Sequence, residues 1–173
     1  MNIKPLITDL VQIERLGEKG RAENERFRKH LKTHDYNERR LRKTAEAIEE
    51  QIDCTQCANC CRVASIELND RDVERLTAFL KIKRVAFLEQ YTVENTEDGT
   101  TDLRRTESGC VFLSGNDCLV YEARPDGCRY FPHLVRGQGP ISTRMWQFID
   151  RACYCPIVYN ALEAFKEETH FRR

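Results

Sequence analysis

The sequence lacks any segment that would place it in a membrane. None of its apolar runs approaches the roughly 20 residues that a helix needs to span a bilayer. Its first turns also carry Asp9 and Glu14, where a secretory signal peptide would have an uninterrupted apolar core. We therefore expect a protein of the cytoplasm that has no membrane among its partners.

The sequence also lacks net charge, because 28 Lys and Arg residues balance 28 Asp and Glu residues. Without an overall positive charge to attract phosphates, nucleic acid is not an expected partner. The segment from Arg15 to Lys43 is the local exception, since basic residues outnumber acidic ones there. We interpret it as a solvated helix face. The alternative is an interaction adaptor that uses these basic helices to bind RNA or an acidic protein.

Common catalytic motifs are absent as well. The sequence has no phosphate-binding loop, no dinucleotide-binding fingerprint, no Gly-x-Ser-x-Gly and no His-Glu-x-x-His. The four histidines are scattered along the chain. His30 and His34 are expected on the surface of a helix, whereas His133 follows Cys128 closely and is an alternative metal ligand.

Cysteine, in contrast, is abundant, with nine residues in a chain of 173. Proteins of the cytoplasm are kept reduced and rarely hold stable disulfides. A chain of this length does not need disulfides to fold, and an odd number would leave one thiol unpaired. The cysteines therefore predict metal coordination. A strained redox disulfide between Cys60 and Cys61, and simple burial of the thiols, are the alternatives.

The first cysteine cluster has the spacing of metal ligands. Cys54, Cys57 and Cys60 are separated by two residues each, which allows a turn to direct their sulfurs at one ion. The same spacing begins a bacterial ferredoxin motif, for which the Cys-Pro pair at Cys155 would supply the remaining ligand. Since neighbouring side chains diverge, Cys60 and Cys61 are not expected on the same single ion. The cluster therefore predicts two metals or a polynuclear centre.

Residues 1–53 contain no cysteine and have apolar residues at helical spacing. Gly17 and Gly20 are expected to end the first helix, and Asp35 is expected to cap a later one. The apolar stripe of that later helix consists of Leu41, Ala45, Ile48 and Ile52. These residues predict an N-terminal helical extension that packs against the rest of the protein.

The remaining chain predicts a less regular structure. Asn69 or Asp70 should cap a helix, the polar segment 92–108 suits a hairpin or loop, and residues 110–132 suit short strands and turns. The last helix should begin at Pro156 with Cys155 as its cap. The aromatic residues expected in the core are Phe112, Tyr121, Phe131 and Trp146. The predicted fold is α+β and mostly helical, with a helical extension at 1–53 and a small irregular cysteine-rich domain at 54–173 that ends in a helix.

These cysteines resemble those of the YkgJ-type cysteine-cluster proteins, a family described as zinc- or iron-chelating. Its first signature stands here as Cys54, Cys57, Cys60 and Cys61. Its second stands as Cys110, Phe112, Leu113, Cys118, Val120, Tyr121, Arg124, Pro125, Cys128, Arg129, Phe131 and Pro132, and the closing Cys-Pro as Cys155 and Pro156. The sequence departs from the family at Ala58, where many members have glycine.

The resemblance implies that the protein chelates zinc or iron. The expected ligands are Cys54, Cys57, Cys60, Cys61, Cys110, Cys118, Cys128 and Cys155, with Cys153 as a spare. Arg124 and Arg129 are expected beside the cofactor, where they would offset the charge of the thiolates. An iron–sulfur cluster such as [4Fe–4S] is also open. The related flagellin lysine N-methylases carry a similar cluster, so an iron–sulfur enzyme of the redox or protein-lysine methyl-transfer type is the alternative function.

Overall fold

The computed structural model describes residues 5–96 and 99–172. In this part of the chain, nine helices make up 57% of the structure and the strands are few and short, which confirms the expected α+β, mostly helical fold. The strands form two-stranded antiparallel sheets. Within the described ranges, no helix is both long enough and apolar enough to cross a bilayer.

The chain forms two compact units, the first of which is discontinuous in sequence. The first unit joins Met1–Asp53 with Pro132–Arg173, and the second consists of Cys54–Phe131. Both this division and the one expected from the sequence have a boundary after Asp53. The extent of the metal-binding domain, 54–173, stays a prediction.

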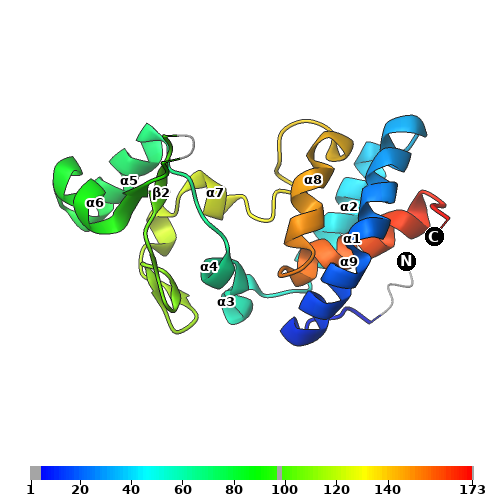
Figure 1. The fold of residues 1–173 in the computed structure, drawn as a ribbon, viewed down its shortest axis with the longest axis horizontal. Helices are drawn as coiled ribbons and strands as arrows, with labels where there is room; N and C mark the ends of the chain where they lie inside the picture. The colour runs from blue at the N-terminus through cyan, green and yellow to red at the C-terminus, as the bar shows by residue number, and fades with distance from the viewer. Residues whose placement is uncertain (1–4, 97–98, 173) are drawn as a thin grey trace. The chain divides into compact units, whose positions relative to one another are not determined.

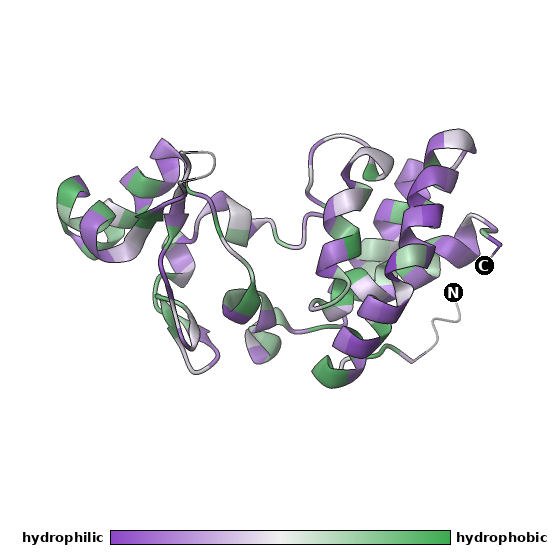
Figure 2. Ribbon diagram, viewed as in Figure 1, coloured by the Kyte–Doolittle hydropathy of each residue, from purple (hydrophilic) through white to green (hydrophobic). Residues whose placement is uncertain are grey.

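Long helices build the first unit: α1 (Leu10–Thr33), α2 (Glu38–Glu49), α8 (Ile141–Arg151) and α9 (Pro156–Glu168). Helix α1 packs against α8 and α9, and α2 packs against α9 (Figure 1). Apolar and polar residues alternate around these helices (Figure 2), because each helix buries one face. The completely buried side chains include Ile13, Phe27, Leu41, Phe148 and Phe165.

The observed helix ends agree only in part with those predicted from the sequence. Pro156 is the first residue of α9 and Cys155 is its N-cap, as predicted. The predicted cap at Asp35 is wrong, since α2 begins after Asn37, whose side chain accepts a hydrogen bond from the amide of Arg40. Both Asp and Asn are good N-caps, so residue type alone did not distinguish Asp35 from Asn37 as the cap.

The predicted end of the first helix at Gly17 and Gly20 is wrong, because α1 runs through both residues. A Cβ at Gly17 would lie 2.6 Å from the carbonyl oxygen of Ala152 and 2.6 Å from the Cα of Cys153. Gly17 therefore allows α1 to approach the end of α8. It is a packing residue and not a helix terminator.

In its described residues, the second unit contains short helices and three small hairpins. Its helices are α3 (Cys54–Cys57), α4 (Asn59–Val63), α5 (Asp70–Leu80), α6 (Arg84–Tyr91), the 3₁₀ helix η1 (Tyr121–Ala123) and α7 (Asp126–Arg129). Asn69 caps α5, as predicted, in a capping box with Asp72. The predicted hairpin is formed by β1 (Thr92–Glu94) and β2 (Thr101–Leu103). Glu97 and Asp98, within the predicted 92–108 segment, lie outside the described residues.

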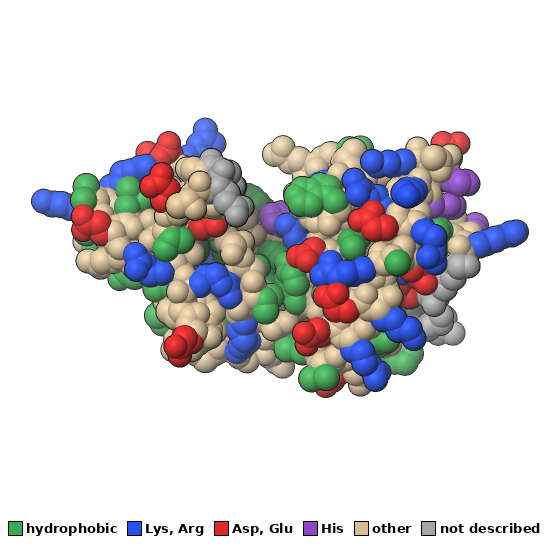
Figure 3. Space-filling model, viewed as in Figure 1, with side chains coloured by type: hydrophobic (Ala, Val, Ile, Leu, Met, Phe, Trp, Pro, Cys, Tyr) green, Lys and Arg blue, Asp and Glu red, His purple; other side chains and the backbone are tan. Residues whose placement is uncertain are grey.

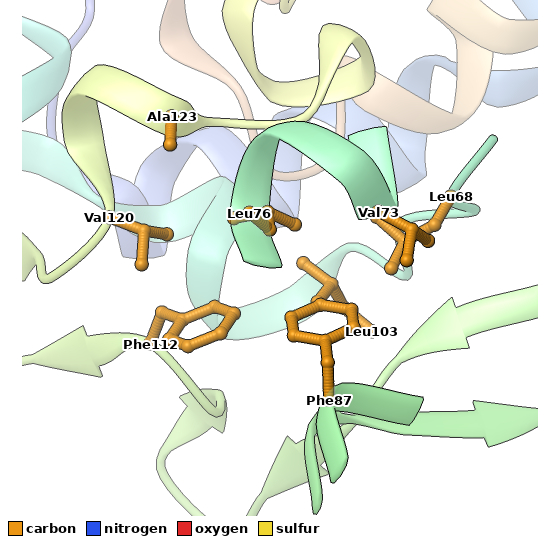
Figure 4. Packing of buried hydrophobic residues seen from close by; sticks show 8 residues of the cluster. All are labelled: Leu68, Val73, Leu76, Phe87, Leu103, Phe112, Val120 and Ala123. Carbon is orange, nitrogen blue, oxygen red and sulfur yellow. The ribbon is translucent and has the colours of Figure 1, made fainter. Parts of the chain in front are cut away.

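An apolar core of its own holds the second unit together. Figure 4 shows the rings of Phe87 and Phe112 facing Val73 and Leu76 of α5. The other buried members of this cluster are Leu68, Leu103, Val120 and Ala123. Cys110 and Cys118 are partly buried and pack against the cluster, so the same core that stabilises the unit also positions two of the predicted ligands.

Candidate metal centre

The first cysteine motif folds into two short helices joined at Ala58. Cys54 and Cys57 lie on α3, and Cys60 and Cys61 lie on α4. Ala58 has the left-handed backbone conformation, with φ of 46° and ψ of 15°, and is buried. This conformation is costly for a residue with a Cβ and is readily adopted by glycine. The chain therefore turns at Ala58, the position at which the sequence departs from the family that it resembles.

The next two cysteines each lie on the second strand of a small hairpin. Cys110 lies on β4 (Gly109–Cys110), which pairs with β3 (Arg105–Thr106), and Cys118 lies on β6 (Asp117–Cys118), which pairs with β5 (Leu113–Ser114). The amide of Phe112 donates a hydrogen bond to the sulfur of Cys110, and the amide of Val120 donates to that of Cys118. Amides directed at sulfur in this manner stabilise thiolates and orient them as ligands.

Four thiols from four segments lie within electrostatic reach of one another: Cys61, Cys110, Cys118 and Cys128. The pKa of Cys128 is raised to about 12, chiefly by burial and also by the charges of the other three thiols, against the opposing effect of Arg124. Burial also raises the pKa of Cys110 and of Cys118, against the amide bonds to their sulfurs. These three thiols therefore favour their neutral form, and a bound cation would favour the thiolates.

Cys61 differs from the other three thiols. Its pKa is lowered to about 6, chiefly because the side chain of Cys60 makes a hydrogen bond to it and also because Arg124 and Arg62 are nearby, against the effect of burial. Cys61 is therefore the thiol of the group that ionises most readily. A low thiol pKa favours metal binding, since the thiolate is the form that ligates.

Arg124 lies close enough to the thiols to offset their charge in part. Arg129 is exposed at the end of α7. The guanidinium of Arg124 stacks on the ring of Tyr121, 3.5 Å from its centroid, and its Nε donates to the Tyr121 carbonyl oxygen at 3.0 Å. It lowers the pKa of Cys61, Cys118 and Cys128. The cofactor-binding role assigned to Arg124 and Arg129 stays a prediction.

The core placement predicted for the aromatic residues is only partly right. Phe112 is buried, and Phe131 is half-buried. Tyr121 is 45% exposed and Trp146 is 58% exposed, so their predicted burial is wrong. The exposed ring of Tyr121 stacks with the guanidinium of Arg124. Nothing in the structure explains the exposure of Trp146 on α8.

Sequence reasoning missed the polar residues that hold the cysteine-bearing segments. Arg62, Arg105 and Asn116 donate hydrogen bonds to carbonyl groups of neighbouring segments around α4. Their acceptors at Gly115 and Gln56 lie more than 50 residues away from their donors in sequence. The only sequence signal was the proximity of Arg62 to Cys61, and it does not reveal these partners.

The other predicted ligands have different surroundings. Cys155 and the spare Cys153 are buried in the first unit, where the thiol of Cys153 donates to the carbonyl oxygen of Ile149 at 3.6 Å. His30 and His34 stack at the end of α1 with ring centroids 4.0 Å apart. His133 has a positive φ of 67° in the first unit. All nine cysteines are thiols, so no disulfide joins the vicinal pair.

The grouping of the thiols falls short of ligating geometry. Among the residues that the structure describes, no three Cys, His, Asp or Glu side chains are grouped closely enough to hold one ion. The four thiols are near enough to influence one another's pKa values but too far apart to hold one ion. Their side chains must move closer together to ligate it. The donor set is nevertheless appropriate, since four thiolates suit zinc and iron.

One comparison with known proteins identifies a family. The family model CxxCxxCC, described as "Putative zinc- or iron-chelating domain", matches residues 53–156, which include all nine cysteines. Searches of curated proteins and of solved structures gave no significant match. The family match covers more than half of the chain and confirms the resemblance seen in its motifs. The protein therefore belongs to the CxxCxxCC family.

Proposed function

We propose that this protein binds zinc or iron through cysteine thiolates of its second unit, with Cys61, Cys110, Cys118 and Cys128 as one four-sulfur site. The observation that supports this most is the convergence of four thiols from α4, β4, β6 and α7 within electrostatic reach. Isolated buried thiols have no reason to gather in this way. A bound dication would balance the thiolate charge that Arg124 offsets in part.

The first motif supplies a second group of donors: Cys54, Cys57 and Cys60. Their two-residue spacing favours a second centre, either another ion or an iron–sulfur cluster such as [4Fe–4S]. The ligand role of Cys155, which lies in the first unit, stays a prediction. The iron–sulfur enzyme of the redox or lysine methyl-transfer type depends on this second centre being a cluster.

The basic N-terminal helices give less support to an adaptor function. Arg21, Arg28 and Arg42 form ion pairs with acidic residues one helical turn earlier, and Arg40 pairs with Glu168. Figure 3 shows basic and acidic side chains interspersed over the helices of the first unit on the face that it displays. We propose the cytoplasm as the location, because a reducing compartment keeps nine thiols available for metal.

Metal analysis of protein purified without oxygen tests this function. We expect zinc or iron at one or two ions per chain, or iron with sulfide and visible colour if a cluster is present. Replacement of Cys128 by serine should remove one ion. Replacement of Cys153 by serine should leave the metal content unchanged, because Cys153 is buried in the first unit and its thiol bonds to the Ile149 carbonyl oxygen of α8. Equal metal content in the wild-type and Cys128→Ser proteins would refute the four-sulfur site.

A further inference from the structure

On the basis of the proposed function, we infer that the ion of the four-sulfur site is exchangeable cargo: protein contacts centred on the positioning residue Arg62 hold the ligand segments in place, so the second unit stays folded when the ion leaves. This differs from zinc-finger domains, in which metal binding supplies the folding free energy. Four sets of contacts carry the inference, and together they reach every segment that bears a ligand.

The first set is the apolar core beneath the two hairpins. Phe112 and Val120, which follow the ligands Cys110 and Cys118 by two residues, are 3% and 1% exposed. The ring of Phe112 stacks on that of Tyr91 at 4.9 Å, and Tyr91 stacks on Phe87 at 5.5 Å. Burial of these side chains anchors both hairpins through the hydrophobic effect, which does not require an ion.

The second set is the clamp formed by Arg62. Its Nη1 donates to the carbonyl oxygen of Cys57 at 3.0 Å, and its Nη2 donates to the carbonyl oxygen of Gly115 at 3.0 Å and to the side-chain oxygen of Asn116. The Asn116 amide in turn donates to the carbonyl oxygen of Gln56 at 2.8 Å. One guanidinium thus joins α3, α4 and the β5–β6 turn.

The third set fixes the β3–β4 hairpin to the end of α4. Arg105 donates to the carbonyl oxygens of Arg62 and of Ala64, the latter at 2.5 Å. These carbonyls belong to the last turn of a helix and its cap, where they have no helical partner. Cys110 is directly opposite Arg105 in the hairpin, so the contact also sets the place of that ligand relative to α4.

The fourth set holds α7, which carries Cys128. The carboxylate of Asp72 is 1% exposed, and it accepts a hydrogen bond from the amide of Asp126 at 3.0 Å. Arg75 donates to the carbonyl oxygen of Arg124 at 2.9 Å and pairs with Asp126 at 3.1 Å. Helix α5 therefore supports the turn before Cys128.

The cysteines are also accessible enough for ligand exchange. Cys54 is exposed, and the other six cysteines of the second unit are half-buried. In the exchange, a thiolate of an acceptor replaces one cysteine sulfur on the ion, and the displaced cysteine takes up the proton that the acceptor thiol released. The oxidation state of the metal does not change. The acceptor is therefore a thiol-bearing chelator, either a small thiol or a cysteine-rich protein.

Metal removal from the full-length protein under reducing conditions tests the inference. Amides of the second-unit core, such as those of Leu76, Phe87 and Leu103, should keep most of their protection from hydrogen exchange without metal. Transfer of the ion to a chromophoric chelator should accelerate in proportion to chelator concentration. Loss of protection throughout 54–131, or transfer at a rate that is independent of the chelator, would overturn the inference. A protein that binds neither zinc nor iron would instead refute the proposed function itself.

Variants of Arg62 test its positioning role. Arg62→Met should weaken metal affinity roughly 10- to 100-fold, as the loss of outer-shell contacts generally does, while core amides remain protected. Arg62→Lys should recover part of the affinity, because one ammonium cannot reach all three acceptors. The matched control is Arg71→Met, which alters an exposed arginine on α5 and should have no effect. Wild-type affinity in Arg62→Met would overturn the role, and if that variant does not fold, the wild-type exchange experiment still decides whether the fold survives metal loss.

Discussion

Gly109 lies directly against the backbone of Cys61. A Cβ at Gly109 would be 2.6 Å from the carbonyl oxygen of Cys61 and 2.8 Å from the Cα of Arg62. Gly109 also has a φ of 124°, which residues with a Cβ rarely adopt. Since Cys110 follows it, this one glycine sets how closely two proposed ligands of the same site approach.

Replacement of Gly109 by alanine should therefore damage both stability and metal binding. We expect a loss of about 3 kcal/mol in the free energy of unfolding, from backbone strain and overlap together, and weaker zinc binding in a competition titration. Gly99→Ala is the control, because Gly99 has a φ of 71° but no atom within 4 Å of its Cβ position. It should cost about 1 kcal/mol and leave metal affinity unchanged. Equal effects of the two variants would show that strain alone matters.

Replacement of Ala58 by glycine should stabilise the second unit. The left-handed conformation costs alanine about 1–2 kcal/mol, and glycine loses part of this gain through the greater entropy of its unfolded chain. The net gain should be about 0.5–1 kcal/mol in denaturant unfolding. Ala64→Gly is the matched control, since Ala64 has an ordinary extended backbone with φ of −81°, and it should destabilise instead. A gain from both variants would contradict this explanation.

Metal binding should release protons in a number set by the thiol pKa values. Near pH 7.5, Cys110, Cys118 and Cys128 are protonated because their pKa values are raised, whereas Cys61 is ionised because its pKa is about 6. Binding at this site should therefore release roughly three protons per ion, and affinity should fall roughly 1000-fold per pH unit as the pH is lowered. Below pH 6, where Cys61 also gains a proton, the fall should steepen.

A zinc titration in weak buffer with a pH indicator measures this release. Cys128→Ser should reduce the number of protons from the site to roughly two, whereas Cys61→Ser should weaken binding and leave the number near three. Release of four protons by the wild-type site at pH 7.5 would mean that Cys61 is not ionised, and the account of its hydrogen bond from Cys60 would be wrong.

The first unit offers a paired test on one helix. Gly17→Ala should lower the free energy of unfolding by about 2 kcal/mol, because the added methyl group meets the backbone of Ala152 and Cys153. Gly20→Ala should raise it by about 0.5–1 kcal/mol, since the nearest atom to its Cβ would be 3.7 Å away and alanine favours helix. The fluorescence of Trp146, the one tryptophan in the chain and part of this unit, follows both transitions. Effects of the same sign would refute the packing role of Gly17.

Features that depend on a few neighbouring residues could be predicted from the sequence. The caps at Asn69 and Cys155 and the hairpin after Tyr91 belong to this class, because the residue types of a short segment decide them. Gly17 could not be interpreted in this way. Its packing partners are more than 130 residues away, and a glycine that ends a helix looks the same in sequence as one that allows two helices to approach.

The candidate site shows the same division. Cysteine spacing predicted the donors, but it did not show that Cys61 lies within electrostatic reach of Cys110, Cys118 and Cys128. That grouping depends on how α4 is held against the hairpins by Arg62 and Arg105, and those bonds join segments that are distant in sequence. Local patterns therefore reveal which atoms can ligate, whereas long-range hydrogen bonds decide which of them meet.

The discontinuity of the first unit has a consequence for synthesis on the ribosome. Helices α1 and α2 emerge first, yet their packing partners α8 and α9 are in the last part of the chain. At about 5–20 residues per second, residues 132–173 take roughly 2 to 8 s to appear after the second unit is complete. The cysteine-bearing unit can thus acquire its native form before the first unit, and its thiols can bind their ion before α1 and α2 pack against α8 and α9.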